Sequence, residues 1–401
     1  MSTAMALEGI RVIDISTVIG APTIGRVLAD FGAEVIKVEA PEGDPVRHMG
    51  AKYKEQSLTW KYYSRNKKCI GLNLRKEEAQ QIIRDLAKES DILLENFRPG
   101  RMDKWGIGYE TLSKLNPGLI MLSFTGYGQD GPYSDKPAFG TLIEGMSGFA
   151  CMVGYPDKPP TLPPFALADG VAASFGLYSI MFALYHRDVK KGKGQHIDVS
   201  LWEPLFSLIG PNAPAYDKLG TIPPRIGNRA YTSAPRNTYK TKDGHWVATA
   251  GATPATAERI MQAVELGHLL EDPKFKDNRS RIQNVEELDV MVQKWFDGKT
   301  RDEAFEIFEK FEAPIGPLYT IEDIINDPHA QHRNMVEKVK DEELGEDILM
   351  EGIFPKMSAT PGKIRHLGRK LGADTEDVLS SILKYPDDKI KELNEKGIIV
   401  T

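Results

Sequence analysis

The strongest constraint on the fold is the alternation of short apolar runs with helical segments in the first third of the chain. Residues 11–16 and 34–39 are predicted strands, and the helix expected between them opens with Pro22 and ends before Gly32. Such a unit joins parallel strands by a right-handed crossover. Further strands are expected at 70–74, 91–97, 119–124 and 197–201, with helices at 76–88 and 170–186 and another from Trp202. The sequence therefore predicts an α/β fold with a doubly wound parallel sheet.

The character of the chain changes near Gly210, where prolines and glycines become frequent. Beyond this point we expect a smaller α+β domain at residues 223–330, whereas residues 1–222 and 331–401 would form the large domain. The end of the chain is predicted to be helical and to rejoin that domain. The expected elements are a hairpin at 237–241 and 245–250, helices at about 255–270, 285–297 and 301–311, and a final helical segment at 374–396.

Composition excludes several classes of function. The 401 residues carry a net charge of −6, which indicates neither a nucleic-acid partner nor a membrane partner. No uninterrupted apolar run reaches membrane-spanning length, and the first nine residues lack the pattern of a signal peptide. Cys69 and Cys151 have no ligand spacing and fit a reduced, cytoplasmic setting. Because neither His-Glu-x-x-His nor Cys-x-x-Cys occurs, we expect no metal.

The first strand–helix turn lacks the glycine pattern of a dinucleotide site. The stretch from Thr17 to Gly25 does not contain Gly-x-Gly-x-x-Gly, and Pro22 removes an N–H that a phosphate would use. We therefore expect neither a nicotinamide nor a flavin cofactor.

Asp169 is the only formally charged residue between Lys158 and Arg187, and it lies just before a long apolar helical pattern. Burying a carboxylate is costly unless it is paired or hydrogen-bonded. Two interpretations follow: Asp169 caps the N-terminus of the following helix, or it is a catalytic nucleophile held ionised by the helix dipole.

The loop that follows the fourth predicted strand is rich in cations and aromatic rings. Its carboxyl-end position is where open α/β sheets bind ligands, and guanidinium groups suit phosphate oxygens. The segment therefore indicates a site for a phosphorylated adenosine, although a solvated basic loop would have the same composition. The side chains concerned are Asn96, Phe97, Arg98, Arg101, Lys104 and Trp105, with Arg75 on the same edge.

Several ordered motifs together resemble family III of the CoA-transferases. The resemblance spans nearly the whole chain and rests on residues 7–14, 32–39, 43–47, 66–74, 95–100, 126–128, 192–198 and Asp169. It implies an interlocked dimer, or a heteromer with a paralogous subunit, whose large Rossmann-like domain is built from both chain ends. Each active site would lie between the large domain of one subunit and the small domain of the other.

The resemblance also implies the chemistry. Asp169 would attack an acyl-CoA to form a mixed anhydride and then an aspartyl-CoA thioester, so that neither ATP nor a metal is needed. Coenzyme A, as acyl-CoA substrate, would be held by Val18, Gly20, Leu72, Arg75, Asn96, Phe97, Arg101, Lys104 and Lys136.

Departures from the family pattern bear on the substrate. Ile19 replaces a glutamine of the formyl-CoA enzyme, and the four-glycine run of that enzyme is absent from residues 225–233. Residues 137–149 and 162–169 look most like members that use succinyl-CoA with a substituted dicarboxylate acceptor, such as benzylsuccinate or citramalate. The expected substrate residues are Ile19, Arg47, Phe139, Arg225 and Arg229, the arginines holding a second carboxylate.

Two alternatives remain at this point. An acyl-CoA racemase or epimerase needs two proton carriers, and the racemase histidine is missing where the chain has Ala138, Phe139 and Gly140. The other alternative is a non-catalytic subunit that pairs with an active paralogue.

Overall fold

In a computed structural model that describes residues 5–401, the chain divides into two compact units. The first contains the residues up to Phe149, Leu162–Gly220 and His332–Thr401, and the second contains Ala150–Thr161 and Thr221–Gln331. The segment Ala150–Thr161, expected in the large domain, therefore groups with the second unit. Residues 1–4, part of the stretch considered for a signal peptide, lie outside the described residues.

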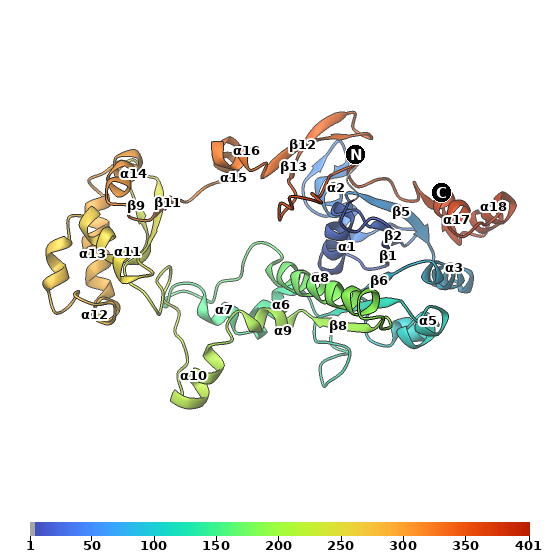
Figure 1. The fold of residues 1–401 in the computed structure, drawn as a ribbon, viewed down its shortest axis with the longest axis horizontal. Coiled ribbons are helices and arrows are strands. Elements are labelled where there is room, and N and C mark those ends of the chain that lie inside the picture. The colour runs from blue at the N-terminus through green and yellow to red at the C-terminus, as the bar shows by residue number, and fades with distance from the viewer. Residues whose placement is uncertain (1–4) are drawn as a thin grey trace. The chain divides into compact units, whose positions relative to one another are not determined.

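The first unit is built on a seven-stranded sheet of order β14-β5-β2-β1-β6-β7-β8 (Figure 1). All neighbouring strands are parallel except β14, which runs antiparallel to β5. The chain proceeds outward from β1 through β2 to β5, and later from β6 through β7 to β8, so the loops after β1 and β6 meet where the strand order reverses. This confirms the predicted α/β fold with a mainly parallel sheet. The strands are β1 (Arg11–Asp14), β2 (Glu34–Glu39), β5 (Lys67–Leu72), β6 (Ile92–Glu95), β7 (Ile120–Thr125), β8 (His196–Ser200) and β14 (Ile399–Val400).

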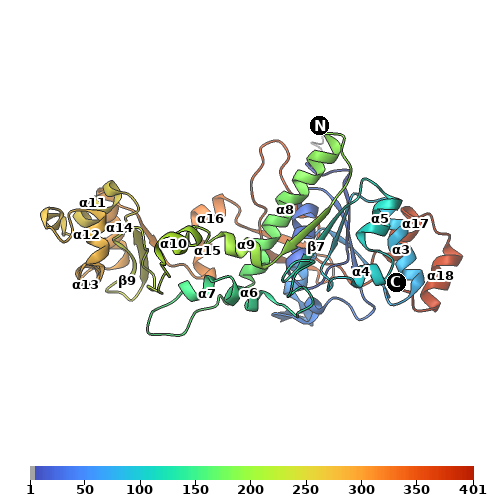
Figure 2. The ribbon, with the colours of Figure 1, turned by 90° about the horizontal axis from the view of Figure 1, so that it is seen from below.

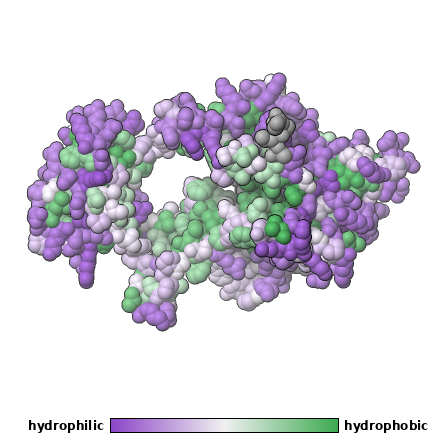
Figure 3. All heavy atoms as spheres, in the orientation of Figure 1, coloured by the Kyte–Doolittle hydropathy of each residue, from purple (hydrophilic) through white to green (hydrophobic). Residues whose placement is uncertain are grey.

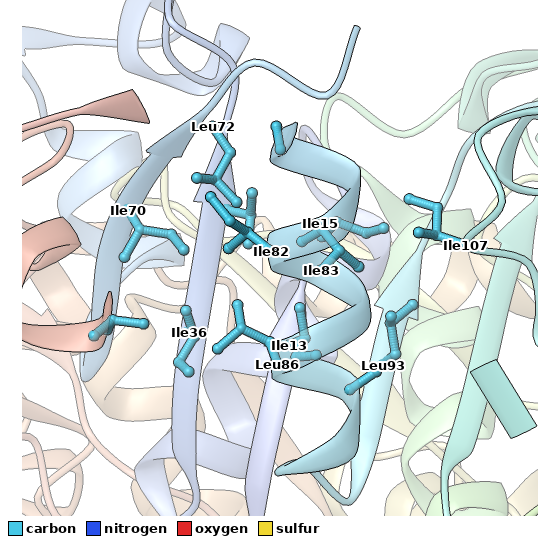
Figure 4. Packing of buried hydrophobic residues seen from close by; sticks show 14 of the residues in the cluster. Ile13, Ile15, Ile36, Ile70, Leu72, Ile82, Ile83, Leu86, Leu93 and Ile107 are labelled. Carbon is cyan, nitrogen blue, oxygen red and sulfur yellow. The ribbon is translucent and has the colours of Figure 1, made fainter. Parts of the chain in front are cut away.

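Helices cover both faces of this sheet (Figure 2). Because successive strand residues point to opposite faces, Ile13 of β1 belongs to one core and Val12 to the other. Figure 4 shows Ile82 and Leu86 of α3 packed over the strand residues of the first core. The helices on that face are α3 (Glu77–Lys88), α4 (Arg101–Lys104), α5 (Tyr109–Leu115), α17 (Thr375–Ser381) and α18 (Asp387–Glu395), and those on the other are α1 (Gly20–Asp30), α6 (Gly140–Met146), α8 (Leu167–Asp188) and α9 (Trp202–Ser207).

Helix α8 has the length and apolar composition of a membrane span, contrary to the sequence expectation that no segment does. Its small residues are nevertheless buried in the protein, among them Ala172 and Gly176, and the helix packs on α1 and β7. A Cβ at Gly176 would come within 2.6 Å of Ile24, so glycine permits the close approach of these helices. One side of α8 therefore packs in the protein, while large side chains such as Phe182 and Tyr185 remain exposed on the helix.

Several elements were missed or misplaced by the sequence patterns. β5 begins at Lys67 rather than Ile70, because the buried Lys67 ammonium pairs with Asp14 at 2.8 Å. The predicted helix at 374–396 is broken into α17 and α18. The remaining elements of the first unit are η1 (Pro45–His48), β3 (Lys52–Tyr53), β4 (Gln56–Ser57), α2 (Leu58–Tyr63), α10 (Asn212–Leu219), β12 (Val336–Asp341) and β13 (Glu346–Glu351). Except for Phe149 and His332, the residues of α7 (Phe149–Met152) and α16 (Pro328–His332) belong to the second unit.

The second unit has its own core around a three-stranded antiparallel sheet of order β11-β10-β9. The predicted hairpin is confirmed, and β11 is an additional strand where Pro314 and Pro317 suggested only a break. Tyr239 and Phe296 stack at the centre of this core, with ring centroids 5.2 Å apart. The elements are β9 (Arg236–Lys240), β10 (Trp246–Ala250), α11 (Pro254–Ala263), η2 (Gly267–Glu271), α12 (Asn278–Gln283), α13 (Val285–Phe296), α14 (Arg301–Lys310), β11 (Ile315–Pro317) and α15 (Ile321–Asn326).

Candidate active site

Asp169 lies in the first turn of α8 rather than at its N-cap. The helix begins at Leu167, and the N-cap residue Ala166 makes no side-chain capping bond. The carboxylate of Glu144, on α6, accepts the Ala168 N–H at 3.3 Å. The expectation that Asp169 caps α8 is therefore wrong, since the helix begins two residues before it and an acid from another helix serves the first turn.

Two glycines make room for the Asp169 carboxylate. A Cβ on Gly20 would lie 2.8 Å from Asp169 Oδ1, and a Cβ on Gly140 would lie 2.7 Å from Oδ2. Gly20 and Gly140 are the first residues of α1 and α6, so the carboxylate lies beside the N-terminal ends of two neighbouring helices as well as its own. The positive ends of helix dipoles stabilise negative charge there.

Burial, together with the nearby Glu144 carboxylate, raises the pKa of Asp169 to about 6, against the lowering effect of the Asp169 backbone N–H. A carboxylate with this pKa is mostly ionised at neutral pH and more basic than an ordinary aspartate. Both properties suit a nucleophile.

Side chains from other segments hold Ser16, Thr17 and Val18 in the turn that follows β1. Lys37 Nζ donates to the Ser16 carbonyl. Asn96 Oδ1 accepts the Thr17 N–H at 2.8 Å, and Asn96 Nδ2 donates to the Thr17 carbonyl at 2.8 Å. The Asn96 amide therefore joins the loops after β1 and β6 at the point where the strand order reverses.

Val18, the next residue of this turn, has a φ of +69°. A β-branched residue in the left-handed region is strained and persists only where its surroundings hold it. Asp44 Oδ1 accepts the Val18 N–H at 3.4 Å, and the Asp44 carboxylate is itself held by Lys37 at 3.0 Å. The conformation of Val18 thus depends on a buried ion pair.

Of the residues expected to hold CoA, Val18 and Gly20 lie in or next to this turn, and Asn96, Phe97, Arg101 and Lys104 lie in the segment after β6. Arg75, Arg101 and Lys104 are exposed cations, and the Arg101 guanidinium lies 5.5 Å from the Trp105 ring centroid. Phe97 meets Trp105 edge to face with ring centroids 5.1 Å apart. Leu72 is fully buried in the core, and the Lys136 ammonium lies 3.8 Å from the centroid of the Tyr133 ring.

The five expected substrate residues have different surroundings. Ile19 is the N-cap residue of α1, and Phe139, 71% exposed, precedes α6. Arg47 is occupied by Glu39, to which it donates at 2.6 and 2.8 Å, and its guanidinium lies 3.7 Å from the centroid of the Trp60 ring.

The two remaining arginines lie in the second unit, where each is bonded locally. Arg225 donates to the carbonyls of Tyr155 and Lys158 at 3.2 and 2.9 Å. Arg229 donates to Asp289 at 2.7 Å. In these positions both guanidinium groups stabilise the second unit itself.

Sequence reasoning missed Glu144, Lys37 and Asp44. Glu144 is the only acid between Asp135 and Asp157, a signal of the same kind as the one that marked Asp169. Lys37 and Asp44 were parts of matched motifs without an assigned role. Within residues 5–401, no group of three or more His, Cys, Asp or Glu side chains is arranged to hold a metal ion.

Comparison with known proteins identifies the family of the chain. Residues 7–375 match the model of CoA-transferase family III. Succinyl-CoA–D-citramalate CoA-transferase of Chloroflexus aurantiacus is 37% identical over 395 residues, 98% of each chain. The beta subunit of succinyl-CoA–L-malate CoA-transferase of the same organism is 39% identical over 402 residues, 99% of each chain. A crystal structure of a CAIB/BAIF family protein from Brucella suis superposes with a TM-score of 0.83 at 29% identity, covering 94% of this chain and 100% of that one.

Proposed function

Because the chain belongs to CoA-transferase family III, we propose that it transfers CoA through covalent intermediates on Asp169. The observation that carries this proposal is the placement of the Asp169 carboxylate between Gly20 and Gly140, half-buried and beside the starts of their helices. A carboxylate in that position is basic enough to attack and has free space only where the glycines lack side chains.

The proposed reaction balances without an added proton, metal or nucleotide. Asp169 attacks the thioester carbonyl of the donor, the C–S bond breaks, and a mixed anhydride and CoA thiolate form. The thiolate attacks the carbonyl carbon of Asp169, releasing the donor acid as a carboxylate and leaving an aspartyl-CoA thioester. The acceptor carboxylate then displaces the thiolate from this thioester. The thiolate finally attacks the acceptor side of the new anhydride, which yields the product acyl-CoA and restores the Asp169 carboxylate.

The proposed donor is succinyl-CoA, and the proposed acceptor is a substituted dicarboxylic acid. The names of the citramalate and malate relatives support both assignments. For CoA itself, the exposed cations Arg75, Arg101 and Lys104 suit its phosphate groups, and Asn96 contacts the turn that leads to α1.

We further propose that the enzyme is an interlocked dimer, of two identical chains or with a paralogue. The outer side of α8 supports an interface, because Tyr178, Phe182 and Tyr185 are exposed there, and Phe182 is 67% exposed. Figure 3 shows hydrophobic residues gathered where Figure 1 places α6, α8 and α9. The name of the malate relative, a beta subunit, supports the heteromeric form. Light scattering of the purified chain measures its mass directly, and a monomer that is active alone would contradict this proposal.

Intact-mass measurement tests the nucleophile. The protein incubated with succinyl-CoA should gain one CoA less one water, and the adduct should map to Asp169. Asp169→Asn should fold, lack the adduct and lose at least about 1000-fold in kcat/KM. Asp188→Asn, at the exposed other end of the same helix, should retain activity. An Asp169→Asn variant with near-normal turnover of D-citramalate or L-malate would refute the mechanism.

A further inference from the structure

A small cavity of about 170 Å³ lies against the carboxyl half of β6, on the side of the seven-stranded sheet covered by α4 and α5. Its lining includes a chain of three polar side chains, Glu95, Ser123 and His196, of which Ser123 and His196 are hydrogen-bonded to each other. The proposed mechanism uses none of these residues. They lie directly behind the turn at Asn96 and Phe97.

Glu95 is the inner end of this chain. It is 2% exposed, ends β6, and accepts the Phe97 N–H through Oε2 at 2.7 Å. Ser123 is the residue opposite Glu95 on β7, and its hydroxyl lies 2.8 Å from His196 Nε2. His196 is exposed to solvent and stacks on Tyr109, with ring centroids 5.4 Å apart. A buried carboxyl, a hydroxyl and a solvent-exposed imidazole therefore line the same cavity.

The charges that face Glu95 make proton binding possible near neutral pH. Burial is the main cause that raises the pKa of Glu95 to about 7, and the charges of Asp103 and Asp198 act in the same direction. Hydrogen bonding to Ser123 and Phe97 lowers this pKa. The other charged or titratable groups around it are His196, Tyr109, Glu110 and Arg98, which line the same cavity. A hydrogen bond to an ionised carboxylate is roughly twice as strong as one to its neutral form.

We propose that Glu95 is a positioning residue for the loop at Asn96 and Phe97, and that the Ser123–His196 pair carries a proton between Glu95 and solvent. The protonation state of Glu95 then determines the strength of its hydrogen bond with the Phe97 N–H. The ionised Glu95 carboxylate accepts a strong hydrogen bond from the Phe97 N–H, and protonation of the carboxylate weakens this bond. The inference rests on the proposed function only in its assignment of CoA to Asn96 and Phe97.

Hydrogen exchange of the Phe97 amide in the ligand-free protein tests the hydrogen bond between the Phe97 N–H and Glu95. After correction for the intrinsic exchange rate, protection in the wild type should rise about fivefold between about pH 5.5 and about pH 8.5. Glu95→Gln should show no such rise, because an amide side chain stays neutral. Ser123→Ala should move the midpoint to higher pH, since a donor to the ionised form is lost. Equal protection in wild type and Glu95→Gln at both pH values would overturn the proposal, and an unmoved midpoint in Ser123→Ala would overturn the role of the relay.

Coenzyme A binding tests whether the hydrogen bond between Glu95 and Phe97 affects the affinity for CoA. Because the 3′-phosphate of CoA ionises in the same range, the quantity compared is the ratio of the Kd of Glu95→Gln to that of the wild type at each pH. This ratio should rise from about one at about pH 5.5 to about five at about pH 8.5, and the same ratio for Glu110→Gln, an exposed acid of the same cavity, should stay near one. A ratio that does not change with pH would overturn the proposal. If the wild type fails to bind CoA, the proposed function is wrong, while the exchange measurement still decides whether Glu95 holds Phe97.

Discussion

The side-chain amide of Asn96 forms hydrogen bonds in both directions with the backbone of Thr17, with both distances at 2.8 Å. These two residues lie in the loops that leave β6 and β1, the strands between which the order of the sheet reverses. The amide therefore fixes, relative to each other, the loop proposed to bind CoA and the turn that leads to Gly20 beside the nucleophile. An aspartate at position 96 would accept the N–H but leave the carbonyl without its donor.

Asn96→Ala should weaken this connection between the two loops. The loss of two largely buried hydrogen bonds should lower the free energy of unfolding by about 1–3 kcal/mol and raise KM for the acyl-CoA more than it lowers kcat. Urea unfolding and steady-state kinetics measure the two effects. Unchanged KM with reduced stability would show that the bonds serve the fold alone.

Gly140→Ala should abolish most activity while the protein remains folded. The added Cβ would lie 2.7 Å from Asp169 Oδ2, so the carboxylate must move from its attacking position. A displacement of about 1 Å costs about 100-fold in rate, which sets the expected loss of kcat. Gly145→Ala is the matched control on the same helix, because its Cβ would meet nothing within 4 Å. Equal activity of the two variants would contradict the proposed geometry.

Glu144→Gln should shift the pH dependence of catalysis. Burial and then Glu144 raise the pKa of Asp169 to about 6, so kcat/KM of the wild type should fall as the pH drops through that value and the nucleophile becomes protonated. Glutamine removes the negative charge but can still accept the Ala168 N–H. The acid limb should move down by up to about one pH unit. A limb that stays in place, or that moves upward, would show that Glu144 does not act on Asp169.

Asp44→Ala should strongly destabilise the protein because it leaves the buried Lys37 ammonium without this partner. The two side chains are 2% and 1% exposed and lie 3.0 Å apart. Breaking a buried pair in this way costs about 3–5 kcal/mol, to be measured by urea unfolding. The exposed pair Lys54–Glu346, at 2.7 Å, offers the control: Glu346→Ala should cost less than about 1 kcal/mol. Similar losses for both variants would mean that Asp44 contributes no more than a surface charge.

The sequence predicted the sheet well because strand and helix periods are local properties. It failed where a charge or a proline was accommodated by distant residues. Lys67 extends β5 only because Asp14 lies opposite its ammonium, and Pro317 belongs to β11 because it pairs with Val247. Asp169 was singled out by its charge in an apolar segment, but its position inside the first turn, and not before it, depends on the distant Glu144.

The amino-acid sequence by itself determined the order of strands and helices and the single acid of the apolar segment, because hydrophobic period, turn residues and side-chain charge are local. Only the tertiary structure decided that Gly20 and Gly140 flank the Asp169 carboxylate, and that Arg47 is paired with Glu39. These relationships arise when segments far apart in the chain pack against each other, and no local pattern records which side chains then become neighbours.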